Sequence, residues 1–329
     1  AIIGTLIFKG VMCMRYYLAP LEGITGYIFR NAVKEQFGEH IDKYFTPFFV
    51  PCHKRTAGRK EEKELYPEHN EGLYLVPQVL TDVAEDCLRF EGKMHAVGYH
   101  EININLGCPS GTVSSKGRGA GFLRDPERLD AFLAEVYANK TGKISVKTRL
   151  GIEDPEEFKR ILDIYNKYPM EELIIHPRVL KEAYKGIPHA DLFLYALKNS
   201  SNPLCYNGDI WTPEDLKKLE EMIRAEGLEW KDPAVMLGRG MVANPALIRE
   251  LAGGEKLTRE ELTVFLRKVT DRYAAEFSGD VPVLHKTKEI WNYMIRHFPG
   301  CEKQLKAIRK AKHLPEYEAA VRSVLATMK

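Results

Sequence analysis

Residues 101–110, which read EININLGCPS, contain an alternating apolar run that stops at a glycine followed by a cysteine and a proline. Ile102, Ile104 and Leu106 are spaced two residues apart, which is the side-chain period of a β-strand. Glycine permits backbone conformations that end a strand, and proline cannot donate a hydrogen bond to a neighbouring strand. We therefore expect Cys108 just beyond the carboxyl end of a strand, the edge where α/β proteins bind their ligands.

The same alternation recurs through the first 240 residues. Strands are expected at residues 15–20, 43–49, 73–80, 101–107, 143–151, 172–178, 203–209 and 234–240, and helices at 27–37, from 81 onward, and at 125–139, 154–167, 191–198 and 212–224. Four of these helices begin with Thr or Asp as the expected N-cap, and three of the four continue with proline. Single helices between strands indicate parallel pairing, so the pattern predicts a (β/α)₈ TIM barrel. The alternative is an open doubly wound sheet, but no G-x-G-x-x-G follows the first strand.

Composition places the chain among ordinary globular proteins and excludes disordered and collagen-like classes, since 44% of its 329 residues are hydrophobic and 29% are charged. The six cysteines form no C-x-x-C pair, so we expect neither disulfides nor a metal site, and a cytoplasmic location. The apolar run at residues 1–8 is too short to span a membrane. We interpret residues 1–13 as an N-terminal extension outside the fold, with Met14 as the natural start. A lipoprotein signal is the alternative, but the small residues expected before Cys13 are missing.

From about residue 253 the strand pattern disappears, and residues 257–277, 283–298 and 302–314 all show helical spacing of apolar residues. The sequence thus predicts a catalytic barrel domain at 14–252 and a domain of three or four helices at 253–329. Residues 254–329 carry 15 Lys and Arg against 10 Asp and Glu, whereas residues 1–253 carry 33 against 36. This excess predicts a polyanionic partner, although a solvated surface is the ordinary alternative.

The most basic helical segment is residues 302–314. Its positive residues recur at intervals of three and four and predict one stripe for a phosphate backbone, formed by Lys303, Lys306, Lys310 and His313, with Arg309 beside it. Leu305 and Ile308 point to another face of the expected helix.

Polar residues recur where the expected strands end, at Gln78, Asn105, Lys147 with Arg149, His176 with Arg178, and residues 207–209 and 238–240. Any one of them can be a buried residue with satisfied hydrogen bonds, but their repetition at corresponding positions indicates a site. NGD after the seventh strand and GRG after the eighth lie where such barrels bind phosphate through backbone N–H groups. Arg239 adds a positive charge there, and Lys147 is placed to stabilise negative charge on a reduced cofactor ring.

Six segments, in this order, resemble the tRNA-dihydrouridine synthases, flavin enzymes that reduce uridines in transfer RNA. They are LAPLEGITGYIFR (18–30), NLGCPSGTVSSKGRGAGFLRDP (105–126), SVKTRLG (145–151), IIHPR (174–178), YNGDI (206–210) and LGRGMVANPALI (237–248). The resemblance covers nearly the whole chain from residue 15. HPRV stands where many members have His-Gly-Arg-Thr, and APLEG where many have Ala-Pro-Met.

The resemblance implies FMN as cofactor, NADPH or NADH as reductant, and tRNA as partner. The sequence gives no indication of an obligate protein partner. It implies that Pro20 and Leu21 back the flavin ring and that Gln78 and Lys147 contact its polar edge. His176 would reach the ribityl-phosphate side, and the phosphate pocket would comprise Asn207, Gly208, Asp209, Gly238 and Arg239. Cys108 would be the general acid, and Asn105, Arg149 and Arg178 would face the substrate.

Reduction of the 5,6 double bond of uracil needs a hydride at one carbon and a proton at its neighbour. A reduced flavin supplies the hydride, and a protonated thiol held across the base supplies the proton. The glycine-rich residues 116–121 are expected to form a mobile loop that closes over the base. A uridine in folded RNA must also be flipped out, and contacts with the C-terminal helices are expected to offset that cost.

Two other roles for Cys108 and two other functions remain at the level of sequence. Cys108 can be a buried structural residue, or a nucleophile, although no nearby motif supplies a histidine to activate it. A flavin barrel can also reduce a free pyrimidine or another small enone without RNA. An RNA-binding protein with an inactive barrel would hold no flavin.

Overall fold

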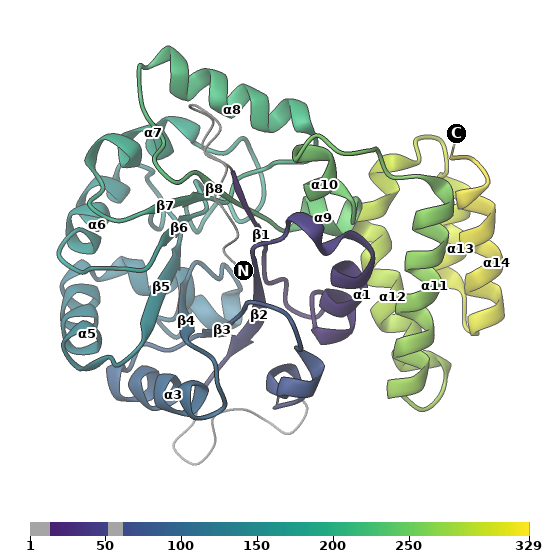
Figure 1. Cartoon of the computed structure of the whole chain (residues 1–329), viewed down its shortest axis with the longest axis horizontal. Coiled ribbons are helices and arrows are strands. Elements are labelled where there is room, and N and C mark those ends of the chain that lie inside the picture. Colours follow the sequence, from purple (N-terminus) through teal and green to yellow (C-terminus); the bar gives the residue numbers. More distant parts are fainter. Residues whose placement is uncertain (1–13, 52–61, 329) are drawn as a thin grey trace, which may run out of the picture.

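The computed structural model describes residues 14–51 and 62–328, and eight parallel strands within these residues close into a barrel in sequence order (Figure 1). The strands are β1 (Arg15–Leu18), β2 (Lys43–Phe49), β3 (Leu75–Val79), β4 (Glu101–Leu106), β5 (Lys143–Thr148), β6 (Leu173–Ile175), β7 (Leu204–Tyr206) and β8 (Ala234–Leu237). β8 pairs with β1, so the sheet has no open edge. The predicted TIM barrel is confirmed and the doubly wound sheet is excluded. The prediction for residues 1–13 falls outside the described residues.

Helices surround the barrel between the strands. They are α1 (Tyr27–Phe37), α3 (Ala84–Ala96), α4 (Gly111–Ser114), α5 (Pro126–Asn139), α6 (Glu157–Tyr165), α7 (Ala190–Asn199) and α8 (Pro213–Ala225), with 3₁₀ turns η1 (Gly38–His40), η2 (Lys63–Leu65), η3 (Pro67–His69) and η4 (Gly119–Arg124). Two predicted N-caps are confirmed. The Asp125 carboxylate accepts a hydrogen bond from the Arg128 N–H at 3.0 Å, and Thr212 forms a capping box with Asp215.

The other two predicted N-caps are wrong, because each of these helices begins two residues later than predicted. α3 begins at Ala84 and α6 at Glu157, after Thr81 and Asp154 respectively. The Thr81 hydroxyl accepts from the Val83 N–H at 3.1 Å, and the Asp154 carboxylate accepts from the Glu156 N–H at 3.0 Å. Both side chains therefore close a turn that precedes the helix, which Thr and Asp do as readily as they cap one.

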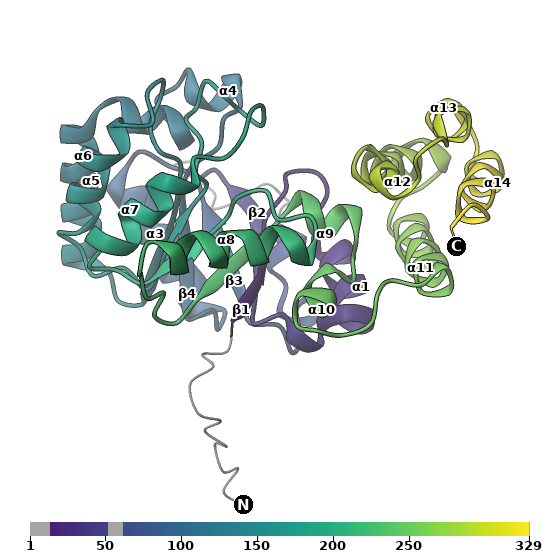
Figure 2. The same ribbon diagram turned by 90° about the horizontal axis from the view of Figure 1, so that it is seen from above.

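After β8 the chain is entirely helical, as predicted. Two short helices, α9 (Arg239–Ala243) and α10 (Leu247–Leu251), lead to four helices beside the barrel (Figures 1 and 2), namely α11 (Arg259–Glu276), α12 (Asp280–Met294), α13 (Glu302–Lys310) and α14 (Leu314–Leu325), with the 3₁₀ turn η5 (Ile295–His297). α13 ends earlier than predicted, and His313 is the N-cap residue of α14. His313 is therefore not part of the stripe on α13.

The four-helix bundle of α11 to α14 is joined to the barrel by apolar contacts. α11 packs against α1, and α12 packs against α9. The Phe265 ring of α11 meets Phe29 edge-on at 5.6 Å and lies 5.8 Å from Phe37, measured between ring centroids. Barrel and bundle residues consequently belong to one hydrophobic cluster.

The interior of the barrel is divided between apolar and polar residues. An apolar cluster fills one part, composed of Tyr17, Ala19, Phe45, Val76, Ile174, Cys205, Ala234 and Met236. Gln78 of β3 and the inward-facing residues of β4 and β5 are polar instead, and Gln78, Asn103 and Ser145 each have 0% exposed surface. Among the described residues, no helix combines the length and the apolar character needed to cross a membrane.

Candidate active site

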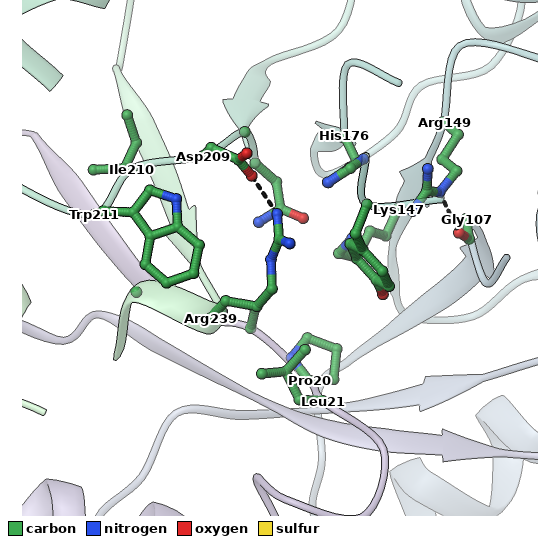
Figure 3. Close-up of a pocket in the computed structure, with 16 residues that line it drawn as sticks. Pro20, Leu21, Gly107, Lys147, Arg149, His176, Asp209, Ile210, Trp211 and Arg239 are labelled. Atoms are coloured by element: carbon green, nitrogen blue, oxygen red, sulfur yellow. Dashed lines mark hydrogen bonds and ion pairs between the residues drawn. The ribbon is translucent and has the colours of Figure 1, made fainter. Parts of the chain in front are cut away.

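A pocket opens at the carboxyl ends of the barrel strands (Figure 3). Every residue predicted to bind the cofactor lines it except Gln78: Pro20, Leu21, Lys147, His176, Asn207, Gly208, Asp209, Gly238 and Arg239. Arg149 lines it as well. Their convergence follows from the strand period, because alternate residues of parallel strands face the interior and the strands end at the same edge.

One end of the pocket carries two arginines bound to a single carboxylate. Arg239 and Arg178 both donate to Asp209, with a 2.6 Å ion pair between Arg178 Nη2 and Asp209 Oδ2. Burial alone would raise the pKa of Asp209, but the two guanidinium groups outweigh burial and hold it below its usual value. A Cβ atom at Gly208 would lie 2.1 Å from the Tyr206 hydroxyl, so the close backbone approach there requires glycine.

Arg178 lies behind this end of the pocket. Its side chain is 0% exposed, and besides Asp209 it donates to the carbonyls of Lys185 at 3.0 Å and Gly186 at 2.7 Å. Unlike Arg149, Arg178 does not line the pocket, so its buried and bonded guanidinium is not presented to a substrate. The placement corrects the prediction that Arg178 faces the substrate, and favours a role in holding Asp209 and the loop after β6.

Lys147 and His176 lie side by side on the opposite wall (Figure 3). Burial, aided by the charge of Arg149, lowers the pKa of Lys147 to about 8. Burial and the neighbouring cations also lower the pKa of His176 well below its usual value, so its ring is neutral. His176 Nδ1 is buried and has no hydrogen-bond partner within the described structure. A buried nitrogen of this kind fits a bound ligand that supplies the missing partner.

The donor set therefore fits an anionic, ring-containing cofactor such as FMN. Arg239 and the glycine backbone at one end suit a phosphate, and Lys147 suits the electron-accepting edge of a ring. Pro20 and Leu21 supply the apolar surface below them (Figure 3).

Cys108 lies in the turn after β4, directly beyond the pocket-lining Gly107. Burial raises the pKa of the Cys108 thiol, so the group stays protonated at neutral pH. Gly119, at φ +56°, packs so closely that a Cβ atom would lie 2.9 Å from the Cys108 Cβ. Arg118 Nε donates to Asp82 at 2.7 Å, so the glycine-rich loop is packed over Cys108 in this structure.

Gln78 and Asn105 are buried beneath the Cys108 turn. Gln78 Oε1 accepts from Asn105 Nδ2 at 2.7 Å, and Gln78 is fully buried rather than part of the pocket wall. Arg149 is also buried, and its Nε donates to the Gly107 carbonyl at 2.9 Å. Asn105 and Arg149 thus flank Cys108, one below it and one beside it.

Two aromatic residues of the pocket were missed from the sequence. The Tyr184 ring lies 4.7 Å from Arg239 Cζ, and the Trp211 ring lies 5.4 Å from the same atom. Arg296, from η5 near the bundle, stacks on Trp211 at 3.8 Å. Both rings belong to loops, where no periodicity marks the inward face. The position of Trp211 directly after NGDI was the available signal.

The lysines predicted to bind RNA lie on α13. Lys303, Lys306 and Lys310 are exposed, whereas Leu305 and Ile308 are buried in the bundle. In Figure 2, α13 lies toward the same upper side as α4, the short helix that follows the carboxyl end of β4. Helix α13 and the carboxyl ends of the barrel strands therefore lie toward the same side of the molecule.

Comparison with known proteins identifies the family. The model of the dihydrouridine synthase family matches residues 17–325. A tRNA-dihydrouridine(16) synthase of Pseudomonas putida is 30% identical over 247 residues, which are 73% of each chain. A tRNA-dihydrouridine(16) synthase of Cupriavidus necator is 27% identical over 92% of this chain and 95% of its own. A probable tRNA-dihydrouridine synthase of Staphylococcus aureus is 30% identical over 70% of this chain and 69% of its own. The match extends through both the barrel and the bundle, and this chain belongs to the dihydrouridine synthase family, the enzymes that reduce uridine in tRNA to dihydrouridine.

Proposed function

We propose that this chain reduces a uridine of tRNA with FMN as its bound cofactor and NADPH or NADH as the reductant that reloads it. The observation that carries the choice of cofactor is the unpartnered buried nitrogen of His176, which lines the same pocket as Lys147 and Arg239. When bound, the reduced flavin would supply the hydride for the uracil double bond.

The residues of the pocket divide between the two ends of this cofactor. Arg239, with the backbone at Gly208 and Gly238, holds the phosphate, and Asp209 orients Arg239. His176 contacts the ribityl-phosphate side, and Lys147 the polar edge of the ring. Asn207 donates to the Met236 carbonyl at 2.6 Å and thereby fixes β7 against β8 at the pocket wall.

Cys108 is the proton donor in this proposal. Its raised pKa keeps the proton on the thiol until the neighbouring uracil carbon requires it. Arg149 and Asn105 flank the thiol and face the base, and Gln78 acts by fixing the amide of Asn105.

In this proposal the bundle binds the RNA, so that residues 14–252 form the catalytic domain and residues 253–329 form the tRNA-binding domain. Extrusion of a base costs a few kcal/mol, and phosphate contacts with Lys303, Lys306 and Lys310 would offset it. We place the enzyme in the cytoplasm, because Cys87, Cys108, Cys205 and Cys301 are all free thiols. No obligate protein partner is proposed.

The proposal is tested by incubating the purified protein with NADPH and tRNA from cells that lack dihydrouridine. We expect a flavin spectrum in the protein and new dihydrouridine at one tRNA position. We propose position 16, because two relatives carry that position in their names and one matches over 95% of its length. Equal activity on free uridine would favour the small-substrate alternative, and absence of flavin would favour an inactive barrel.

FMN affinity should fall as the pH rises through about 8. The charged ammonium of Lys147 favours the polar edge of the flavin, and in the free protein the pKa of this group is about 8. The affinity for FMN is therefore highest below the pKa of Lys147 in the free protein. Above that pKa it declines by about tenfold per pH unit, until the pH reaches the pKa of Lys147 in the complex. Fluorescence titration with FMN at several pH values measures this slope.

Lys147→Arg is the matched variant for this titration. A guanidinium keeps its charge to much higher pH, so the slope between roughly pH 7 and 9 should flatten even if the affinity itself changes. Identical slopes in the two proteins would show that Lys147 does not contact the flavin through its charge.

A further inference from the structure

A chain of side-chain hydrogen bonds runs through the interior of the barrel toward Cys108. Its five members come from three adjacent strands and are exposed by 7% or less: Glu101, Ser145, Asn103, Gln78 and Asn105. Glu101, Asn103 and Asn105 are alternate residues of β4, so all three face inward. The chain spans β4 from its amino end to its carboxyl end.

Every bond in this chain has a defined direction. Ser145 Oγ donates to Glu101 Oε1 at 2.9 Å and accepts from Asn103 Nδ2 at 2.9 Å. Asn103 Oδ1 accepts from Gln78 Nε2 at 2.8 Å, and Gln78 Oε1 accepts from Asn105 Nδ2 at 2.7 Å. Asn105 Oδ1 then accepts from the backbone N–H groups of Gly107 at 3.0 Å and Cys108 at 2.9 Å.

Glu101 sets the direction of the whole chain. Its other oxygen, Oε2, accepts from Lys43 Nζ at 2.8 Å and from the Tyr74 hydroxyl at 3.1 Å. A carboxylate in an ion pair accepts hydrogen bonds only, so Ser145 must donate to it and must accept from Asn103. Each amide is thereby restricted to one of its two orientations, and the last one presents an oxygen to the Cys108 turn.

A chain of buried polar groups is not the most stable way to fill a barrel. The other part of the same interior is filled with apolar side chains, including Phe45, Ile174 and Met236. A buried polar network gains little stability over such packing, but when fully satisfied it enforces one geometry. The geometry enforced here is that of the turn carrying Cys108.

We propose that Glu101, Ser145 and Asn103 are positioning residues that fix the Gly107–Cys108 turn and, through it, aim the thiol at the base. None of the three lines the pocket, so they act only through Gln78 and Asn105. The consequence for catalysis rests on the proposed role of Cys108 as proton donor.

The test compares Ser145→Ala and Asn103→Leu in the flavin-loaded enzyme with Tyr17→Phe as the control. The Tyr17 hydroxyl donates to Glu172 Oε1 at 2.8 Å inside the same barrel but outside the chain, so its removal breaks one buried hydrogen bond, whereas Ser145→Ala breaks two. Ser145→Thr keeps the hydroxyl and is the rescue variant. Thermal unfolding of each variant reports the purely structural cost.

The first readout is alkylation of Cys108 by iodoacetamide, followed by peptide mass spectrometry. Loss of the two hydrogen bonds of the Ser145 hydroxyl should loosen the turn and raise the alkylation rate about fivefold in Ser145→Ala, more in Asn103→Leu, and not in Tyr17→Phe. The second readout is single-turnover reduction of uridine in tRNA by the pre-reduced enzyme. It should slow by about tenfold to a hundredfold, because small misplacements of a reacting group cost that much. Reduction of the flavin by NADPH should stay within about twofold.

The two readouts separate the proposal from the role of Cys108. Alkylation rates in Ser145→Ala and Asn103→Leu that match Tyr17→Phe would overturn the positioning role. Faster alkylation with unchanged uridine reduction would show that the hydrogen-bond chain supports the turn. It would also show that Cys108 is not the acid. If both half-reactions slow in proportion to the loss of thermal stability, the hydrogen-bond chain only stabilises the fold and the positioning role is overturned.

Discussion

Cys108→Ala should slow the reduction of uridine in tRNA by about 10² to 10⁴, the range that a positioned general acid contributes. The variant keeps the pocket, because Cys108 lies beyond the wall formed by Gly107, Lys147 and His176. Flavin content and flavin reduction by NADPH should therefore stay close to those of the unaltered enzyme. Stopped-flow measurement of the two half-reactions separates these effects.

Two further variants complete this experiment. Cys87→Ala makes the same change at a buried thiol of α3, remote from the pocket, and should leave both half-reactions unchanged. Cys108→Ser keeps the size of the side chain but replaces the thiol with a far weaker acid, so little activity should return. Turnover of Cys108→Ala on tRNA at the normal rate would remove the cysteine from the chemistry.

Reversing the charge of the α13 stripe should weaken tRNA binding by about a hundredfold or more at moderate salt, because three phosphate contacts become repulsions. In the variant with Lys303, Lys306 and Lys310 changed to Glu, the log–log salt dependence should flatten by about two to three units, roughly one for each lost contact. The effect should appear in KM for tRNA and in direct binding, without change in flavin reduction by NADPH.

The matched control is the same reversal at Lys198, Lys217 and Lys218, three exposed lysines on α7 and α8. It alters the net charge equally but on the outer helices of the barrel. A similar loss of affinity in the two triple variants would mean that net charge alone attracts the RNA. Unchanged affinity in the α13 variant would move the RNA-binding surface to another part of the molecule.

Much of the site was predictable because it depends on a short-range rule. Alternate residues of a strand face the same side, so Asn105, Lys147, His176 and Asn207 had to meet once the eight strands were recognised. The family resemblance then supplied roles that periodicity alone does not give.

The errors arose where long-range contacts decide the outcome. The exposure of Arg178 depends on Asp209 and on carbonyls of a loop whose path no local pattern indicates. Tyr184 and Trp211 reach the pocket because Arg239 and Arg296 attract their rings. At Thr81 and Asp154 the local sequence does not decide whether the side chain closes a turn or caps a helix, because the same side-chain oxygen can accept the hydrogen bond in both cases.

The insertion of Phe265 between Phe29 and Phe37, together with the packing of α12 on α9, limits how the enzyme can be re-engineered. If the bundle binds tRNA as proposed, exchange of bundles between paralogues would be the obvious route to redirect an enzyme from one nucleotide to another. Here the graft boundary cannot lie in the linker alone, since a transplanted bundle must also match the faces of α1 and α9. α9 begins at Arg239, so a poorly matched chimera would disturb the cofactor pocket along with the choice of nucleotide.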